Sequence, residues 1–335
     1  MNKKDLKIHI IGAGVSGLIA ARVLENHGFS PVIIEATDRV GGRVKTDLIG
    51  GYRLDHGFQV LLTAYPAAQK YLDYKALELQ KFLPGASIFL NNGQKLIGDP
   101  LRSPSLLFST LFSGIGTISD KIRILKLNLY LKKKSLTTIF AENEQTTHSY
   151  LTNLGFSEEI ITNFFKPFFS GIFLETKLET SSRMFEFVYK MFGEGHATLP
   201  KSGIEAIPKQ LLENLKTTTL KYNTKVETLK ETEITLNGGT CLKSDYTIIA
   251  TEASELVSNL KNQSTAWKSC VTLYFETDAR VIAKKLIGLI SKPGTLVNNI
   301  FYNSSLDARI KPANELLSVT VIDTQSLSHE VLIEA

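Results

Sequence analysis

Residues 8–36 read IHIIGAGVSGLIAARVLENHGFSPVIIEA, and this stretch decides the fold. It begins with an apolar run that ends at glycine, which predicts a buried parallel strand. The following SGLIAARVLENHG has apolar residues at helical spacing and stops at Gly28, a common helix terminator. PVIIEA then predicts a second strand. The stretch is therefore a complete strand–turn–helix–strand unit, and this context makes the GAGVSG turn a strong signal of dinucleotide binding.

Each glycine of the turn has its own physical task. Gly12 permits the tight turn, Gly14 lets a pyrophosphate approach the backbone, and Gly17 lets the helix pack on the strand. The start of the helix offers free N–H groups to the phosphates. Glu35 lies 35 − 12 = 23 residues after Gly12, where a carboxylate accepts hydrogen bonds from ribose hydroxyls and repels a 2′-phosphate. The pattern favours NAD or FAD over NADP.

A second glycine pair follows directly, in ATDRVGGRVKT, residues 36–46. This segment is too short and too rich in glycine to be another crossover helix. The bare backbone of Gly41 and Gly42 can approach a dinucleotide, and the planar guanidinium of Arg43 suits a phosphate. The pair therefore favours FAD over NAD.

Together, GAGVSG, EA and DRVGGR resemble the superfamily of FAD-dependent amine oxidases and phytoene-desaturase-like oxidoreductases. The resemblance covers most of the chain. It implies an α/β fold, α+β overall, in which a Rossmann-like FAD-binding domain is interleaved with a substrate domain of helices plus an antiparallel sheet. Thr37 departs from the pattern, because an arginine commonly follows the Glu-Ala pair in this family.

Further segments extend the resemblance. Residues 51–66, GYRLDHGFQVLLTAYP, are similar to a family segment in which a D-x-G turn passes beside the flavin. Residues 164–210 are similar to a little-characterised branch of phytoene-desaturase-like oxidoreductases, and the LPKSGIEAIPKQLLENL run would return the chain to the FAD-binding domain through an amphipathic helix. Val226 would contact the adenine through its backbone, and TIIATEA, residues 247–253, would close the cofactor site.

The resemblance thus implies one set of FAD-binding residues. They are Gly12, Ala13, Gly14, Val15, Ser16, Gly17, Glu35, Ala36, Gly41, Gly42, Arg43, Gly57, Phe58, Gln59, Val226 and Thr251. His56 lies beside them and is interpreted as structural. We name no catalytic acid or base, because no Ser-His-Asp or Cys-His arrangement is visible.

Both predicted domains are discontinuous. The FAD-binding domain is placed at 1–75 and 200–262, and the substrate domain at 76–199 and 263–335. Residues 76–199 are expected to be rich in helices. Strands are expected at SCVTLYF (269–275), TLVNNIFY (295–302) and LLSVTVI (316–322), and short strands around an NGG turn at 220–251. The family's closing strand, Gly-Asp pair and helix are not recognisable before residue 335, so the chain is expected to be truncated.

Composition narrows the class of protein. A mean hydropathy of +0.01 argues against a membrane-spanning protein, and two cysteines without a C-x-x-C motif indicate a reducing cytoplasm. The six histidines are scattered, so no metal site is expected. The net charge of +5 comes without a basic block interleaved with aromatic residues, so no nucleic-acid partner is expected either. The oligomeric state stays open.

One basic run has two interpretations. DKIRILKLNLYLKKKSL, residues 120–136, predicts either a helix whose apolar side covers the substrate domain or an amphipathic surface that contacts lipid and collects a hydrophobic substrate. A cytoplasmic protein, with or without peripheral membrane contact, fits both interpretations.

The resemblance implies an FAD-dependent oxidoreductase that removes a hydride from a C–H bond beside nitrogen or in an allylic position. The aromatic residues of 164–173 and 184–192 indicate an apolar, bulky small-molecule substrate, unless they only pack the helical domain. Two alternatives remain. One is a non-enzymatic relative similar to Rab GDP-dissociation inhibitors, which bind a prenylated partner without flavin. The other is an NAD-dependent Rossmann dehydrogenase.

Overall fold

The computed structural model describes residues 3–99, 102–257, 260, 265–306, 314–322 and 327–334. They fall into two compact units. The first unit consists of Met1–Asp47, Gln69–Glu78 and Ser202–Trp267, and the second of Leu48–Ala68, Leu79–Lys201 and Lys268–Ala335. The boundaries of the predicted functional domains remain predictions.

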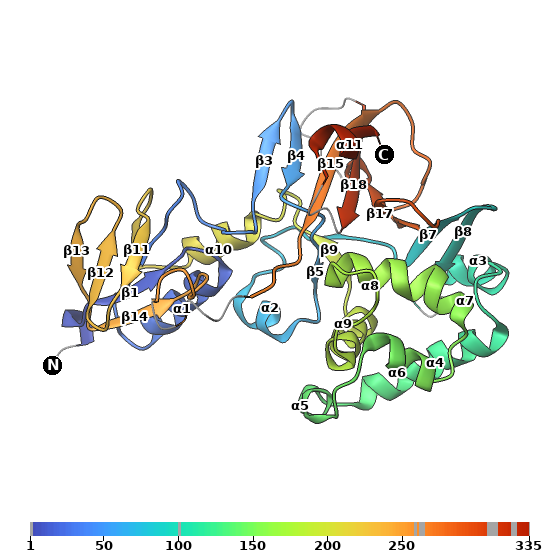
Figure 1. Cartoon of the computed structure of the whole chain (residues 1–335), viewed down its shortest axis with the longest axis horizontal. Helices are drawn as coiled ribbons and strands as arrows, with labels where there is room; N and C mark the ends of the chain where they lie inside the picture. Colours follow the sequence, from blue (N-terminus) through green and yellow to red (C-terminus); the bar gives the residue numbers. More distant parts are fainter. Residues whose placement is uncertain are drawn as a thin grey trace. The chain divides into compact units, whose positions relative to one another are not determined.

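A four-stranded parallel sheet forms the centre of the first unit (Figure 1). Its strands, in the order β10-β2-β1-β14, are Thr219–Lys221, Val32–Ile34, Ile8–Ile11 and Tyr246–Ile249. Every residue of β1 is buried, as its continuous apolar run predicts. Helix α1, Val15–Asn26, connects β1 to β2 and buries Gly17, Leu18 and Ala21.

The third strand of this sheet comes from a distant part of the chain. Helix α10, Ala206–Glu213, packs on α1 and leads into β10. After β2 the chain leaves the first unit at Asp47, re-enters it at Gln69–Glu78 and returns at Ser202, just before α10. β10 begins 219 − 34 = 185 residues after the end of β2, and β14 then completes the sheet. The amphipathic helix predicted to return the chain is this α10.

An antiparallel ribbon separates β10 from β14. It consists of β11 (Val226–Leu229), β12 (Glu233–Leu236) and β13 (Cys241–Lys243). The predicted NGG turn joins β12 to β13, and both of its glycines have positive φ, 90° at Gly238 and 81° at Gly239. Val226 and Ile234 bury the ribbon against Ile11 and Ile34.

A six-stranded sheet organises the second unit. Its strands, in the order β15-β18-β17-β16-β7-β8, are Cys270–Thr277, Glu315–Ile322, Val297–Tyr302, Ile287–Ile290, Gly85–Leu90 and Gly93–Gly98. Three of them, β15, β17 and β18, are the strands predicted from sequence. The sheet is antiparallel except for the parallel pair β16–β7. The β7–β8 hairpin lies in a segment expected to be helix-rich, although its Asn-Asn-Gly turn between apolar runs is a hairpin signal.

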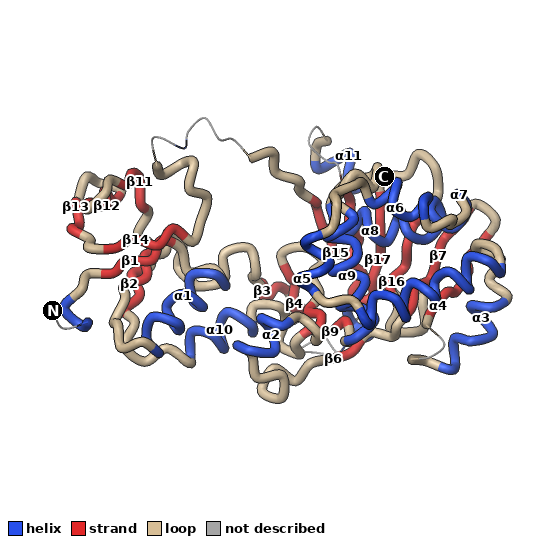
Figure 2. The backbone as a smooth tube through the Cα atoms, turned by 90° about the horizontal axis from the view of Figure 1, so that it is seen from below, coloured by secondary structure: helices blue, strands red, loops and turns tan. Residues whose placement is uncertain are grey.

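Helices gather on one side of this sheet (Figures 1 and 2). They are η2 (Pro104–Leu106), α3 (Leu107–Leu111), α4 (Ile118–Lys133), α5 (Leu136–Ala141), α6 (Thr147–Asn153), α7 (Glu158–Ile160), η3 (Ile161–Phe165), α8 (Lys166–Phe173) and α9 (Ser182–Glu194). Their shared core includes Phe165, Phe169 and Phe185, each 0–1% exposed, together with Ile88 and Leu289 of the sheet. Most of the aromatic residues interpreted as a sign of an apolar substrate pack here, against one another.

The remaining elements are short. They are η1 (Lys3–Asp5), the pair β3 (Thr46–Ile49) and β4 (Tyr52–Asp55), the sheet of β5 (Leu61–Leu62), β9 (Ala197–Leu199) and β6 (Gln80–Lys81), α2 (Pro66–Tyr71), η5 (Asn303–Leu306) and α11 (His329–Glu334). Among the residues described, no helix is both long enough and apolar enough to cross a membrane.

Candidate cofactor site

The glycine-rich turn lies at the carboxyl edge of the parallel sheet. The turn follows β1, Glu35 follows β2, and Thr251 comes two residues after the end of β14. With the order β10-β2-β1-β14, the chain places strands on both sides of β1. Open α/β sheets bind ligands in the crevice at such a switch point. Three segments that the sequence predicts to contact a cofactor therefore meet at one edge.

The turn has the shape that a diphosphate needs. Gly12 has φ +100°, which L side chains rarely adopt, and a Cβ on Gly17 would lie 2.0 Å from the carbonyl oxygen of Gly12. A Cβ on Gly14, in contrast, would meet no described atom within 4 Å. Gly12 and Gly17 are thus glycines because of the protein's own packing. Gly14 leaves open space in front of the turn, which fits an approaching phosphate.

The second glycine pair packs directly on the first turn. The N–H of Gly41 donates to the carbonyl of Ala13 at 2.9 Å, and Gly14 and Gly41 form a parallel bridge. Gly41 and Gly42 have φ +122° and +59°, and a Cβ on Gly42 would lie 3.4 Å from the Cα of Gly14. The two glycine turns therefore form one continuous backbone surface.

Glu35 ties this surface together. The carboxylate is buried, with 7% of the residue exposed. One oxygen accepts from the N–H of Ala13 at 2.7 Å, and the other accepts from the N–H and the hydroxyl of Thr37 at 2.9 and 2.8 Å. These bonds use three of about four acceptor positions of a carboxylate. Thr37, which stands in place of the common family arginine, is thus a partner of Glu35 that sequence reasoning missed.

The start of α1 is available to a ligand. Gly14 is its N-cap residue and has extended backbone, with φ −68° and ψ 175°, and it makes no side-chain cap hydrogen bond. Val15 and Ser16 form the first turn, whose N–H groups carry the positive end of the helix dipole. Ala36 is exposed beside Glu35.

Arg43 contacts an aromatic ring that the sequence did not single out. Its guanidinium lies 5.3 Å from the ring centre of Trp267, a cation–π distance. The indole N–H of Trp267 lies 3.1 Å from each carboxylate oxygen of Glu252, the residue after Thr251. Trp267 is 52% exposed. Trp267 thereby connects Arg43, which follows the second glycine pair, with Glu252, which follows β14.

An ion pair fixes the second glycine turn to the returning helix. The guanidinium of Arg39 lies 3.1 Å from the buried carboxylate of Glu205, which also pairs with Lys209 at 3.2 Å. Pro208 lies 3.4 Å from where a Cβ on Gly41 would be. The start of α10 therefore packs against the second glycine turn and holds it in place. Arg39 and Glu205 are 205 − 39 = 166 positions apart, so no local motif encodes this contact.

Val226 and Thr251 lie close to the same strand ends. Val226 is 5% exposed and shares a core cluster with Ile11 and Ile34, the last residues of β1 and β2. A Cβ on Gly12 would lie 3.6 Å from the Cβ of Thr251. Both predicted contacts are therefore near the turn.

Gly57, Phe58 and Gln59 belong to the second unit. The hydroxyl of Tyr274 donates to the carbonyl of Asp55 at 2.8 Å, and burial raises the pKa of that hydroxyl. The side chain of Gln59 donates to the carbonyl of His56 at 2.8 Å. These bonds fix the loop that the resemblance places beside the flavin.

An aromatic group lies against this loop. The ring of Phe58 packs on Phe301 and Phe82 with centres 5.5 and 6.2 Å apart, and Phe82 and Phe301 are 4.7 Å apart. Phe58 is half-buried, whereas Phe301 is 1% exposed. His56 is exposed.

A row of polar side chains crosses the six-stranded sheet of the second unit. Thr272 pairs with Thr320, and Thr320 pairs with Asn299, so the three side chains point to one face of β15, β18 and β17. Thr320 and Asn299 are each 3% exposed, yet their Oγ1 and Oδ1 atoms, and Oγ1 of Thr272, have no hydrogen-bond partner among the described residues. Sequence reasoning placed these strands but not this row.

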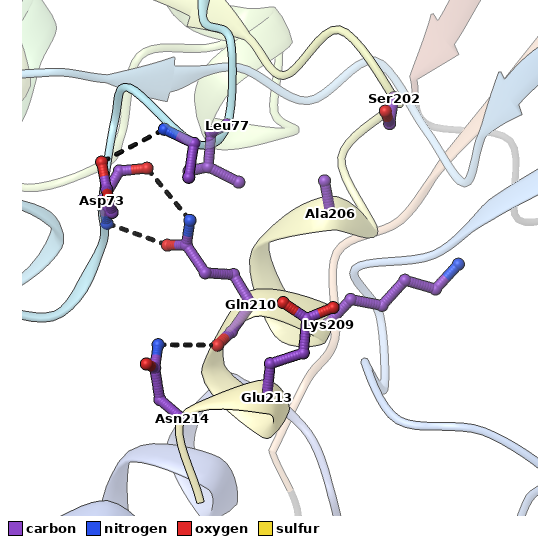
Figure 3. Close-up of a pocket in the computed structure, with 9 residues that line it drawn as sticks. Asp73, Leu77, Ser202, Ala206, Lys209, Gln210, Glu213 and Asn214 are labelled. Atoms are coloured by element: carbon purple, nitrogen blue, oxygen red, sulfur yellow. Dashed lines mark hydrogen bonds between the residues drawn. The ribbon is translucent and has the colours of Figure 1, made fainter.

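A separate surface pocket of about 410 Å³ lies in the first unit (Figure 3). It is lined by Asp73, Ala76, Leu77, Ser202, Ala206, Lys209, Gln210, Glu213 and Asn214. Asp73 and Gln210 bind each other through two hydrogen bonds, of 2.9 and 3.0 Å. None of the predicted cofactor residues lines it. Among the residues described, no cluster of three or more His, Cys, Asp or Glu could hold a metal ion.

Comparison with known proteins decides the family. Residues 15–335 match the sequence model of the family of flavin containing amine oxidoreductases. The chain belongs to this family. Membership confirms the predicted resemblance and the flavin cofactor, FAD.

The individual relatives differ in chemistry. The chain is 27% identical to protoporphyrinogen oxidase 2 of Arabidopsis thaliana over 168 residues, 49% of the chain and 32% of that protein. It is 35% identical to an L-amino-acid oxidase of Sistrurus catenatus edwardsii over 104 residues, 30% of the chain and 20% of that protein. The matching region thus spans about a third or less of these relatives.

Solved structures confirm the fold class. An oxidoreductase from Methanosarcina mazei is similar with a TM-score of 0.74 and 16% identity, over 98% of this chain and 81% of that chain. Wild-type putrescine oxidase bound to putrescine gives a TM-score of 0.64 and 18% identity, over 97% and 78% of the two chains. At such identities the likeness concerns the fold alone.

Proposed function

We propose that this protein is an FAD-dependent oxidoreductase that removes a hydride from a C–H bond of an apolar small molecule. The observation that supports this most is the junction of the two glycine turns, in which Gly41 bonds to Ala13 at the carboxyl edge of the parallel sheet. A single glycine turn would serve many nucleotides. The second glycine turn, at Gly41 and Gly42, adds a backbone surface that suits a flavin dinucleotide, and the family to which the chain belongs contains flavin.

The proposed roles follow from the geometry. Gly12, Gly14 and the first turn of α1 would hold the diphosphate through backbone N–H groups. Arg43 would neutralise phosphate charge. Glu35 would order the turn and offer its remaining acceptor position to the ribose. When bound, FAD supplies the hydride acceptor, and the protein supplies position, exclusion of water and electrostatics.

The apolar substrate is proposed on a different basis from the sequence argument. The phenylalanines of η3, α8 and α9 that are fully buried serve core packing, so their number says little about a substrate. Phe58 supports the proposal better, because it is only half-buried and belongs to the loop that the resemblance places beside the flavin, where it packs on Phe82 and Phe301. The reacting C–H bond would be beside nitrogen or in an allylic position.

A substrate panel tests this proposal. The FAD-loaded protein is mixed without oxygen with protoporphyrinogen, an L-amino acid, putrescine and an apolar polyene, and bleaching of the flavin is followed. The expected result is fastest bleaching by an apolar, bulky compound. Bleaching only by small charged amines would contradict the apolar substrate but keep the oxidoreductase. Bleaching by none of the four would count against the proposed reaction class.

A further inference from the structure

Helix α4 carries apolar side chains on two opposite sides. Leu127 and Leu131 are 4% and 1% exposed and pack in the helical core. A second set lies at i, i+4, i+7 and i+11 and is exposed to 74%, 49%, 42% and 63%: Ile118, Ile122, Leu125 and Leu129. At about 100° per residue, these four fall within roughly 60° of one another, and Leu127 lies on the far side. Core packing therefore accounts for one side only.

Helix α3, which precedes α4 in the chain, also exposes apolar side chains. Leu107, Phe108 and Leu111 are 44%, 72% and 50% exposed, and Phe112, which follows them, is 75% exposed. The ammonium group of Lys121 donates to the carbonyl of Leu111 at 2.7 Å, so the end of α3 lies against the first turns of α4. We refer to the exposed apolar residues of both helices, 107, 108, 111, 112, 118, 122, 125 and 129, as the α3–α4 surface. Single exposed apolar residues are ordinary, but a gathering of eight marks an interaction site.

Exposed lysines flank the α3–α4 surface. Residues 102–141 contain seven Lys or Arg and one Asp, but Lys134 is buried and paired with Glu142 and Glu186, so it adds no charge to the surface. Lys126, Lys132 and Lys133 are exposed. Their helical positions put Lys126 and Lys133 on one side of the apolar stripe and Lys132 on the other. The acid, Asp120, is fully buried and does not offset them.

The helix that carries this surface is firmly held. Thr117 and Asp120 form a capping box at its start, and Asp120 also accepts hydrogen bonds from the backbone and hydroxyl of Ser157 at 2.9 and 2.7 Å. At its end, the buried ammonium of Lys190 donates to the carbonyls of Leu131 and Lys132 at 2.8 and 3.2 Å. Helix α4 is therefore already ordered in the free protein, so its exposed apolar residues and lysines need not fold on binding.

We propose that the α3–α4 surface docks onto an anionic lipid membrane, with α4 in the plane of the interface. Phenylalanine and leucine would enter the boundary between headgroups and acyl chains, and the flanking lysines would meet the negative headgroups. A second copy of the chain fits less well, because a two-fold interface on this stripe would bring the same lysines against each other. The proposal does not depend on the reaction proposed above.

Vesicle binding tests the proposal. The protein is sedimented with vesicles of phosphatidylcholine alone and with about 30% phosphatidylserine added. Two variants alter the surface: Phe108→Ser with Phe112→Ser and Leu129→Ser, and Lys126→Glu with Lys132→Glu and Lys133→Glu. Matched controls change three exposed apolar residues elsewhere, Leu48, Ile49 and Val281 to Ser, or three other exposed lysines, Lys284, Lys285 and Lys292 to Glu.

The expected result is binding to anionic vesicles that falls with added salt and drops at least tenfold in both surface variants but in neither control. Thermal unfolding of each variant shows that it is folded. Weak binding of the unaltered protein to both kinds of vesicle would overturn the proposal. So would a dimer, seen by sedimentation velocity, that the surface variants dissociate while vesicle binding is unchanged.

Discussion

The backbone N–H of Gly41 donates a hydrogen bond of 2.9 Å to the carbonyl of Ala13. Through this bond two glycine turns on either side of α1 and β2 become one surface. Glycine is needed on both sides, because Gly12, Gly41 and Gly42 have positive φ, and a Cβ on Gly42 would lie only 3.4 Å from the Cα of Gly14. The relationship makes the roles of individual glycines separable by experiment.

Gly14 and Gly17 should respond differently to substitution. Gly14→Ala is expected to change the free energy of unfolding of the flavin-free protein by about 1 kcal/mol or less, because its Cβ meets no described atom. The same Cβ would occupy the space of the phosphates, so FAD affinity should fall at least tenfold. Gly17→Ala should instead cost about 3 kcal/mol or more, because its Cβ would overlap a carbonyl oxygen. Denaturant unfolding measures the stability of both variants, and FAD titration measures their affinity for the cofactor. Equal losses of stability in the two variants would contradict the different roles of Gly14 and Gly17.

Glu35 should matter even without the cofactor. Both carboxylate oxygens accept from backbone N–H groups, so Glu35→Gln must turn its NH₂ group toward one of these donors. We expect a loss of about 1–3 kcal/mol in the stability of the flavin-free protein and at least a tenfold loss of FAD affinity. Glu227→Gln, an exposed change of equal charge in the same unit, is the control. Unaltered apo stability would mean that Glu35 does not order the turn.

The local part of the site could be predicted from sequence. The strand, glycine turn, helix and acidic strand end are encoded within 29 residues, 8–36, so short-range patterns suffice. The predicted strands β15, β17 and β18 are found for the same reason, since their alternating or continuous apolar runs are local signals.

Long-range pairing could not be predicted in the same way. The third parallel strand, β10, overlaps the start of the stretch 220–251 in which short strands are expected, but its three residues carry no signal of parallel pairing with β2. The bond between Gly41 and Ala13 and the ion pair between Arg39 and Glu205 join segments whose register depends on the folded chain. The β7–β8 hairpin has a turn signal in the sequence, Asn91-Asn92-Gly93, but it lies in a region expected to be helical as a whole.

The polar row of the second unit gives a stability prediction. Thr320 is buried and its hydroxyl has no hydrogen-bond partner among the described residues, so Thr320→Val should stabilise the protein by about 1 kcal/mol. Thr198 is equally buried, but its hydroxyl donates to the carbonyl of Leu61 at 2.7 Å. Thr198→Val should therefore destabilise by about 1–2 kcal/mol. Denaturant unfolding measures the free energy of unfolding of both variants. A strong loss of stability in Thr320→Val would show that this hydroxyl has a hydrogen-bond partner.

Asp120 should make the protein sensitive to acid. Burial alone would raise the pKa of its carboxyl, but hydrogen bonds from Ser157 and Thr117 outweigh burial and lower the pKa below the ordinary value. A carboxyl with a lowered folded pKa stabilises the protein above about pH 4 and loses this contribution as the pH falls through the folded pKa. Asp120→Asn should cost about 2 kcal/mol at neutral pH and progressively less toward about pH 3. A cost that does not change with pH would contradict this origin.

Titration of the flavin-free protein with FAD and, in parallel, with NAD shows which dinucleotide the two glycine turns bind. Trp267 is the one tryptophan of the chain and lies 5.3 Å from the guanidinium of Arg43, so its fluorescence reports on ligands at the second glycine turn. We predict saturable quenching at one FAD per chain, unaffected by about a hundredfold excess of NAD and weakened at least tenfold by Gly14→Ala. Saturation by NAD, with no response to FAD, would show that the two turns do not form a flavin site.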